Sequence, residues 1–244
     1  MNILVSNHEK FPEFSVFGTI VWMLFLTLGI QGILVFITAI SMEVLKGTSK
    51  EIELAFMRPD AIAILGVIAA VLSYPLIKKA SHQPGKSFPY EFLAFQSVNR
   101  ATLAKVLMVG FGYYIFESLA SYILSIDTPQ FMLDVKSQTL SVFDMLMLVL
   151  GVCIVAPIVE EVIFRGLAYA RLVKSRAGVT GAIIITSLVF TVIHTQYDFT
   201  VLIILSLFAF LLGYVRYKTG NIFYCIAIHM QINILSTIEL FAFL

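Results

Sequence analysis

The sequence predicts an all-α, polytopic membrane helix bundle, and three observations support this prediction. Of the 244 residues, 59% are hydrophobic and only 13% are charged, about half the charged fraction of a typical soluble domain. The mean hydropathy is +0.95. The apolar residues gather in runs of about 17–25 residues, the length that a bilayer core requires. We therefore expect a single integral membrane domain over residues 1–244.

Seven apolar runs are candidate transmembrane helices. They cover about 14–40, 61–77, 101–124, 143–173, 179–196, 200–216 and 221–243. The fourth run is longer than a span needs, so we expect it to tilt or to project from the bilayer. Pro157 lies within this run. Proline removes a backbone donor and tends to kink a helix, which would open space beside Glu160.

The segment 86–100 is predicted to be amphipathic and juxtamembrane rather than spanning. Its apolar residues would lie on the surface of the inner leaflet. These residues are Phe88, Phe92, Leu93, Phe95 and Val98.

The placement of lysine and arginine predicts a cytosolic N-terminus and an external C-terminus. In this orientation, eleven basic residues lie on the inner side and four on the outer side. The inner residues are Lys10, Lys78, Lys79, Lys86, Arg100, Lys105, Arg171, Lys174, Arg176, Arg216 and Lys218. The outer residues are Lys46, Lys50, Arg58 and Lys136. The protein is thus expected to be a multi-pass membrane protein, in the cell membrane if its source is bacterial.

Two adjacent carboxylates and an arginine interrupt the fourth run. Each charge costs a few kcal/mol at the bilayer centre, so such groups pair, face a protein-lined cavity, or do chemistry. Glu161 and Arg165 are four residues apart with the acid first, which is the favourable order for an ion pair on a helix. Glu160 points about 100° away from Glu161 and needs another partner. A structural charge cluster that links helices is the simpler explanation of these three residues.

Two later runs bring further polar groups to the membrane. Phe190 precedes His194 by four residues, and His229 precedes Asn233 by the same spacing. A carboxylate with a neutral imidazole can deprotonate a bound water. A second imidazole and an amide can donate hydrogen bonds to the oxyanion of a tetrahedral intermediate. This set of groups indicates hydrolysis of an amide bond by an activated water.

Three motifs resemble those of one protein family. They are Glu-Glu-x-x-x-Arg at 160–165, Phe-x-x-x-His at 190–194 and His-x-x-x-Asn at 229–233. In this order they resemble the CPBP family, which comprises type II CAAX prenyl endopeptidases, abortive infection proteins and bacteriocin-processing proteases. The similarity covers about 143–240, whereas residues 1–140 form variable N-terminal helices without a matching motif.

The resemblance implies an intramembrane glutamate peptidase whose cavity opens toward the cytosol and the lipid. Glu160 and His194 would activate water, and His229 and Asn233 would form the oxyanion hole. The supporting residues would be Glu161, Arg165 and Phe190. The resemblance implies no metal and no cofactor. The partners would be a peptide or protein substrate, possibly lipidated, and the bilayer.

Three alternatives remain open on the sequence. A zinc protease could use Glu160, His194 and His229 as ligands, although the sequence has no His-Glu-x-x-His motif. A non-catalytic protein could bind a peptide with the same cluster. A proton pathway or transporter could also use intramembrane carboxylates and histidines. The net charge of +1 gives no indication of a nucleic-acid partner, and the oligomeric state is left open.

Overall fold

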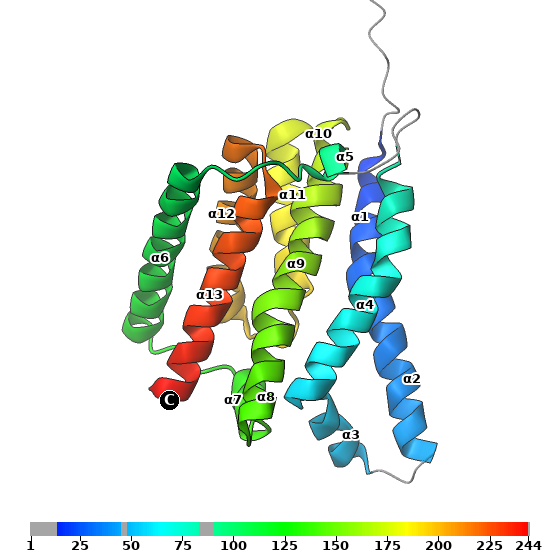
Figure 1. The fold of residues 1–244 in the computed structure, drawn as a ribbon, viewed down its shortest axis with the longest axis vertical. Coiled ribbons are helices and arrows are strands. Elements are labelled where there is room, and N and C mark those ends of the chain that lie inside the picture. Colours follow the sequence, from blue (N-terminus) through cyan, green and yellow to red (C-terminus); the bar gives the residue numbers. More distant parts are fainter. Residues whose placement is uncertain (1–13, 45–47, 83–89, 244) are drawn as a thin grey trace, which may run out of the picture.

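The computed structural model describes residues 14–44, 48–82 and 90–243, and every regular element in these ranges is a helix (Figure 1). The predicted all-α class is therefore confirmed. The elements are α1 Val16–Leu24, η1 Phe25–Gly29, α2 Ile30–Val44, α3 Ser49–Phe56, α4 Pro59–Ala80, α5 Tyr90–Leu93, α6 Arg100–Ile123, α7 Gln130–Ser137, α8 Val142–Leu148, η2 Val149–Val155, α9 Ala156–Glu161, η3 Val162–Ala168, α10 Tyr169–Val173, α11 Gly178–Val192, α12 Phe199–Thr219 and α13 Ile222–Ala242, where η marks a π-helical segment.

Within the described ranges, six continuous helices are long and apolar enough to cross a membrane. They are Val16–Glu43, Pro59–Ala80, Arg100–Ile123, Val142–Val173, Phe199–Thr219 and Ile222–Ala242. Each matches a predicted run to within a few residues. The remaining predicted span, the fifth run at 179–196, is not confirmed. The helix α11 has 15 residues, about 22 Å, against roughly 30 Å for a bilayer core. It ends at Val192, before a short polar connection in which Asp198 caps α12.

The long span Val142–Val173 lies at the centre of the bundle and comprises α8, η2, α9, η3 and α10 (Figure 1). Its first half packs against α4, and η2, α9 and η3 pack against α13. Helix α6 covers the other side of α13, while α11 packs against both α10 and α12. The centre of the bundle is therefore the helix that carries the two adjacent carboxylates.

The central span changes from α-helical to π-helical hydrogen bonding at two places. The π-helical segments η2 and η3 have seven residues each and flank the six-residue α9. Pro157 lies in the first turn of α9, where it cannot donate a backbone hydrogen bond. The ribbon continues through this position as one helix (Figure 1). Single π turns inside α-helices are uncommon and occur frequently at functional sites.

The connection between α12 and α13 is a two-residue turn. Gly220 ends α12 in the left-handed conformation, with φ 64°, which a residue without Cβ adopts without strain. Asn221 begins α13, and its side-chain oxygen accepts from the backbone N–H of Phe223 at 3.0 Å. Its amide also donates to the carbonyls of Gln96 and Ser97, at 3.1 and 3.2 Å. The segment 94–99 is thus fastened across the start of α13.

The structure buries residues 92–94 of the predicted amphipathic segment and leaves 96–100 exposed. Only Tyr90–Leu93 is helical, and Phe92 and Leu93 are buried in the main core. Phe95 packs edge-on against Phe223 of α13, whereas Val98 is 42% exposed. The difference arises because the backbone of 94–99 finds hydrogen-bond partners on α13. Phe88 lies outside the described residues.

Candidate active site

A fully buried ion pair connects α9 to η3. Arg165 Nη1 donates to Glu161 Oε1 at 3.0 Å, and both side chains are completely shielded from solvent. The predicted pair is therefore present. Arg165 Nη2 donates to the backbone carbonyl of Ala209 in α12 at 2.9 Å. This contact ties the central span to a helix that follows it in the chain.

His229 links the two carboxylates. Its Nδ1 lies 2.9 Å from Glu161 Oε1, and because that oxygen is a carboxylate, Nδ1–H is the donor. The other ring nitrogen, Nε2, lies 3.7 Å from Glu160 Oε2. Glu160 differs from Glu161 in that its side chain keeps 22% exposure. Glu160 was expected from the sequence to need a partner, and that partner is His229. The two carboxylates lie near different ring nitrogens of His229.

The ring of Phe190 lies between the charged and imidazole groups. It is fully buried, and its centroid lies 4.6 Å from that of His194 and 5.9 Å from that of His229. The guanidinium of Arg165 lies 4.7 Å from the same centroid, within the range of a cation–π contact. One aromatic ring therefore fixes the relative positions of residues from η3, α11 and α13.

His194 lies just beyond α11 rather than within a span, because that helix ends at Val192. Its Nδ1 is 2.6 Å from the carbonyl oxygen of Phe190. A carbonyl only accepts hydrogen bonds, so Nδ1 carries the proton and the neutral ring presents an unprotonated Nε2. The ring of Tyr197 is nearly parallel to that of His194, at 2° with centroids 6.2 Å apart. His194 is thus held between two aromatic side chains.

Glu160 and His194 do not contact one another directly. No hydrogen bond or ion pair joins these two described residues; the close neighbour of Glu160 is His229. The shared water that we expect between Glu160 and His194 stays a prediction.

Asn233 lies one turn after His229 on α13. Its Nδ2 donates to the carbonyl of Val152 in η2 at 2.8 Å. An amide NH₂ has two donors, so the second remains for another acceptor. The Thr237 hydroxyl donates in turn to the backbone carbonyl of Asn233 at 2.7 Å. The structure therefore fixes Asn233 against the π-helical segment, and its predicted role as an oxyanion donor stays a prediction.

Two residues near the site were not singled out by the sequence. The only feature of the sequence that could have indicated Tyr197 is its position three residues after His194. Arg216 was counted solely as a basic residue at the inner ends of helices, yet it is buried. Its Nε donates to the backbone carbonyl of Arg165 at 2.9 Å, and its guanidinium lies 4.9 Å from the Tyr169 ring. Arg216 thus binds a carbonyl of η3 from the far side of the ion pair.

The zinc hypothesis requires Glu160, His194 and His229 to converge as ligands. Among the described residues, no three His, Cys, Asp or Glu side chains are grouped as metal ligands would be. Glu161 and the carbonyl of Phe190 instead bind Nδ1 of His229 and of His194. These bonds leave Nε2 of each ring as the atom that would bind a metal, so the zinc hypothesis stays an untested alternative.

Comparison with known protein families adds one match. Residues 142–235 match the family model described as type II CAAX prenyl endopeptidase Rce1-like. The matched region covers less than half of the chain; it begins with α8 and reaches into α13, so it contains Glu160, His194, His229 and Asn233. No curated protein and no solved structure matches the chain. The six apolar helices indicate an integral membrane protein, and the matched region is similar to type II CAAX prenyl endopeptidases.

Proposed function

We propose that this protein is an intramembrane endopeptidase of the glutamate type, which hydrolyses a peptide bond with an activated water. The observation that carries the proposal is the bridging position of His229. Its Nδ1 donates to the buried Glu161, so its Nε2 is directed at the partly exposed Glu160. The membrane protein thus holds a reactive carboxylate beside fixed imidazoles, where an ordinary span would be apolar.

In the proposed reaction, a water binds between Glu160 and His194. Glu160 takes a proton from this water as its oxygen attacks the carbonyl carbon of the scissile bond. His194 accepts a hydrogen bond from the same water through its unprotonated Nε2. When the C–N bond breaks, the proton passes to the leaving amine, which leaves the new carboxyl group on the other product. The hydrogen bond to the Phe190 carbonyl supports this role, because it fixes the tautomer of His194.

The oxyanion of the tetrahedral intermediate would receive hydrogen bonds from His229 and Asn233. Asn233 has one donor left after its bond to Val152. His229 would donate from Nε2 with a proton that the ring holds before the water is activated, so the proton that Glu160 takes from the water passes only to the leaving amine. Both donors sit on one face of α13, which the bonds to η2 and α9 hold in place.

The proposed substrate is a peptide or protein that reaches the site from the cytosol or the bilayer and that carries a lipid in some cases. The excess of basic residues on one side supports a cytosolic N-terminus and an external C-terminus. The site would then open toward the cytosolic side. Abortive-infection activity, bacteriocin processing and CAAX processing all remain within this class of chemistry.

The proposal is tested with the purified full-length protein in lipid nanodiscs. Fluorogenic peptides that end in a cysteine-containing sequence are offered with and without a farnesyl group on the cysteine. We expect hydrolysis of at least one form, complete loss in Glu160→Ala, and unchanged turnover after exhaustive metal stripping verified by metal analysis on the same sample. Stoichiometric zinc whose removal stops hydrolysis, and whose return restores it, would instead support the zinc protease. Binding of the peptide without hydrolysis would support a non-catalytic role.

A further inference from the structure

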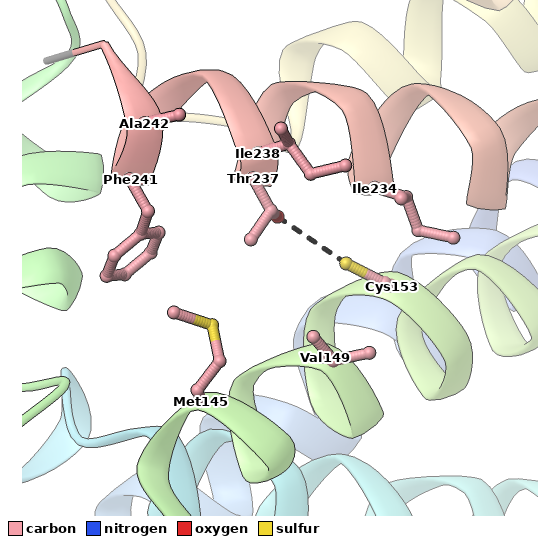
Figure 2. A pocket seen from close by; sticks show the side chains of 8 residues that line it. All are labelled: Met145, Val149, Cys153, Ile234, Thr237, Ile238, Phe241 and Ala242. Atoms are coloured by element: carbon pink, nitrogen blue, oxygen red, sulfur yellow. Dashed lines mark hydrogen bonds between the residues drawn. The ribbon is translucent and has the colours of Figure 1, made fainter. Parts of the chain in front are cut away.

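A cavity lies between the central span and the last turns of α13, beyond Asn233. It has a volume of about 440 Å³, within the range of small-molecule pockets. Figure 2 shows its walls: Met145 and Val149 face the α13 side chains across the space. The lining residues are Met145, Val149, Cys153, Ile234, Thr237, Ile238, Phe241 and Ala242. None of them belongs to the proposed catalytic set.

The walls of this cavity are apolar. Two of the lining side chains, Cys153 and Thr237, have polar atoms, and these lie 3.5 Å apart and satisfy one another (Figure 2). An ordered water needs two to four polar partners, which such walls do not provide. The cavity therefore favours a hydrocarbon occupant over water or a polar ligand.

The cavity is accessible from the bilayer. Both of its walls belong to helices that are long and apolar enough to span a membrane. Ile234 and Ile238 line it and are also 42% and 54% exposed on the surface of α13. A chain that lies in the lipid can thus enter sideways, without crossing a polar surface.

A lysine lies beside Phe241, one of the residues that line the cavity. Lys136 in α7 donates from Nζ to the carbonyl of Leu240 at 2.9 Å, and its ammonium lies 5.8 Å from the ring centroid of Phe241. An ammonium has three donors, so two remain. Among the described residues, Lys136 forms no ion pair. The nearby acids Asp134 and Glu239 accept hydrogen bonds from Gln130 and Tyr114 instead.

We propose that this cavity binds an acidic membrane amphiphile, a fatty acid or an anionic phospholipid. One hydrocarbon chain would fill the space between η2 and α13, and the acidic headgroup would bind Lys136. The apolar walls and the ammonium of Lys136 beside Phe241 match the two parts of such a molecule. The proposal does not depend on peptidase activity.

The bound chain would lie against the residues that position Asn233. Thr237 contacts the cavity and donates to the backbone carbonyl of Asn233. Cys153 follows Val152, which accepts the side-chain hydrogen bond of Asn233. Occupation of the cavity would therefore stabilise the contact between η2 and α13 from the side opposite to His229.

The test uses the full-length protein in nanodiscs of zwitterionic lipid and two photoreactive probes. One probe is a diazirine-labelled palmitic acid and the other is its uncharged methyl ester. Peptide mapping should place the cross-links of the acid within 145–153 and 234–242. We expect Lys136→Gln to weaken capture of the acid roughly tenfold, as for the loss of one charge-assisted hydrogen bond, and to leave the ester unchanged. Lys136→Arg should retain capture of the acid.

Two further variants test the cavity itself. Val149→Trp should fill the space and abolish capture of both probes at these segments. Ile184→Trp is the matched control, because Ile184 is 43% exposed on α11 and does not line the cavity. Cross-links spread evenly over all lipid-facing helices would overturn the proposal. So would equal capture of acid and ester by the unaltered protein, a comparison that requires no variant to fold.

Discussion

The two adjacent carboxylates of α9 lie in two different regions of the same site. On the buried side, Glu161 is fully shielded and is bound by Arg165 and His229. On the open side, Glu160 keeps 22% of its side-chain surface exposed and lies 3.7 Å from His229 Nε2. Neighbouring positions on a helix point about 100° apart, and this rotation alone separates them. One carboxylate is bound into the contacts between helices, and the other stays accessible for the reaction that we propose.

The largest effect is expected on the open side. Glu160→Gln should lower turnover of a peptide substrate by roughly 10²–10⁴, because it removes the general base. Its yield and thermal unfolding temperature should match those of the unaltered protein, since Glu160 takes no part in the buried ion pair. Glu239→Gln is the matched control: Glu239 accepts a hydrogen bond from Tyr114 at 2.8 Å, which a glutamine can also accept. Full turnover in Glu160→Gln would reverse the roles of the two sides.

The buried side should show its effect in stability. Arg165→Leu leaves Glu161 without its cation and should destabilise the protein by about 3–5 kcal/mol, seen as a lower unfolding temperature and a smaller monodisperse fraction. Arg58→Leu provides the comparison, because Arg58 is 57% exposed in its pair with Asp60. The loss of such a pair costs about 0–1 kcal/mol. Equal stability of the two variants would mean that the buried pair has no structural role.

Asn233 is bound to Val152 in η2 and is also a proposed oxyanion donor, so its variants separate a structural role from a catalytic one. Asn233→Ala should reduce turnover by roughly 10²–10³, the usual effect of removing one oxyanion donor. The measurement is kcat of the folded fraction, together with its unfolding temperature. Asn233→Leu should have the same effect on kcat, since it keeps the volume and loses the donor. If only the unfolding temperature fell, Asn233 would serve to bind Val152 and nothing more.

The smallest effect concerns the ring that stacks on His194. Tyr197→Leu removes an aromatic contact worth about 0.5–1.5 kcal/mol and should lower kcat by roughly two- to tenfold. Tyr197→Phe keeps the ring and should stay close to the unaltered protein. Tyr214→Leu is a control on an exposed tyrosine that is paired with Tyr217. A loss in Tyr197→Phe as large as that in Tyr197→Leu would assign the role to the hydroxyl group.

The parts of the fold and site that depend on local sequence could be predicted. Six helices follow from the length and apolarity of their runs. The pair of Glu161 with Arg165 follows from a spacing of four on one helix. Phe190 and His194 meet for the same reason, across the last turn of α11. In both of these contacts, the two residues are four positions apart in the sequence.

The other contacts join residues that are distant in sequence. The bonds of His229 to Glu161 and of Asn233 to Val152 depend on how α13 packs against the central span. The burial of Phe92 depends on the bonds that fasten 94–99 to Asn221. Hydropathy and spacing carry no information on any of these.

The π-helical segments give the central helix an adjustable register. A π turn holds more residues than an α turn over the same hydrogen-bonded repeat. Because η2 takes up an extra residue in this way, deletion of one residue from 149–155 would let it wind as an ordinary α-helix and would leave Glu160 facing nearly its present direction. Deletion of one residue from α8 would instead turn everything beyond it by about 100°. The central span can therefore lose a residue from η2, but not from α8, and keep each carboxylate of α9 on the side that it now occupies.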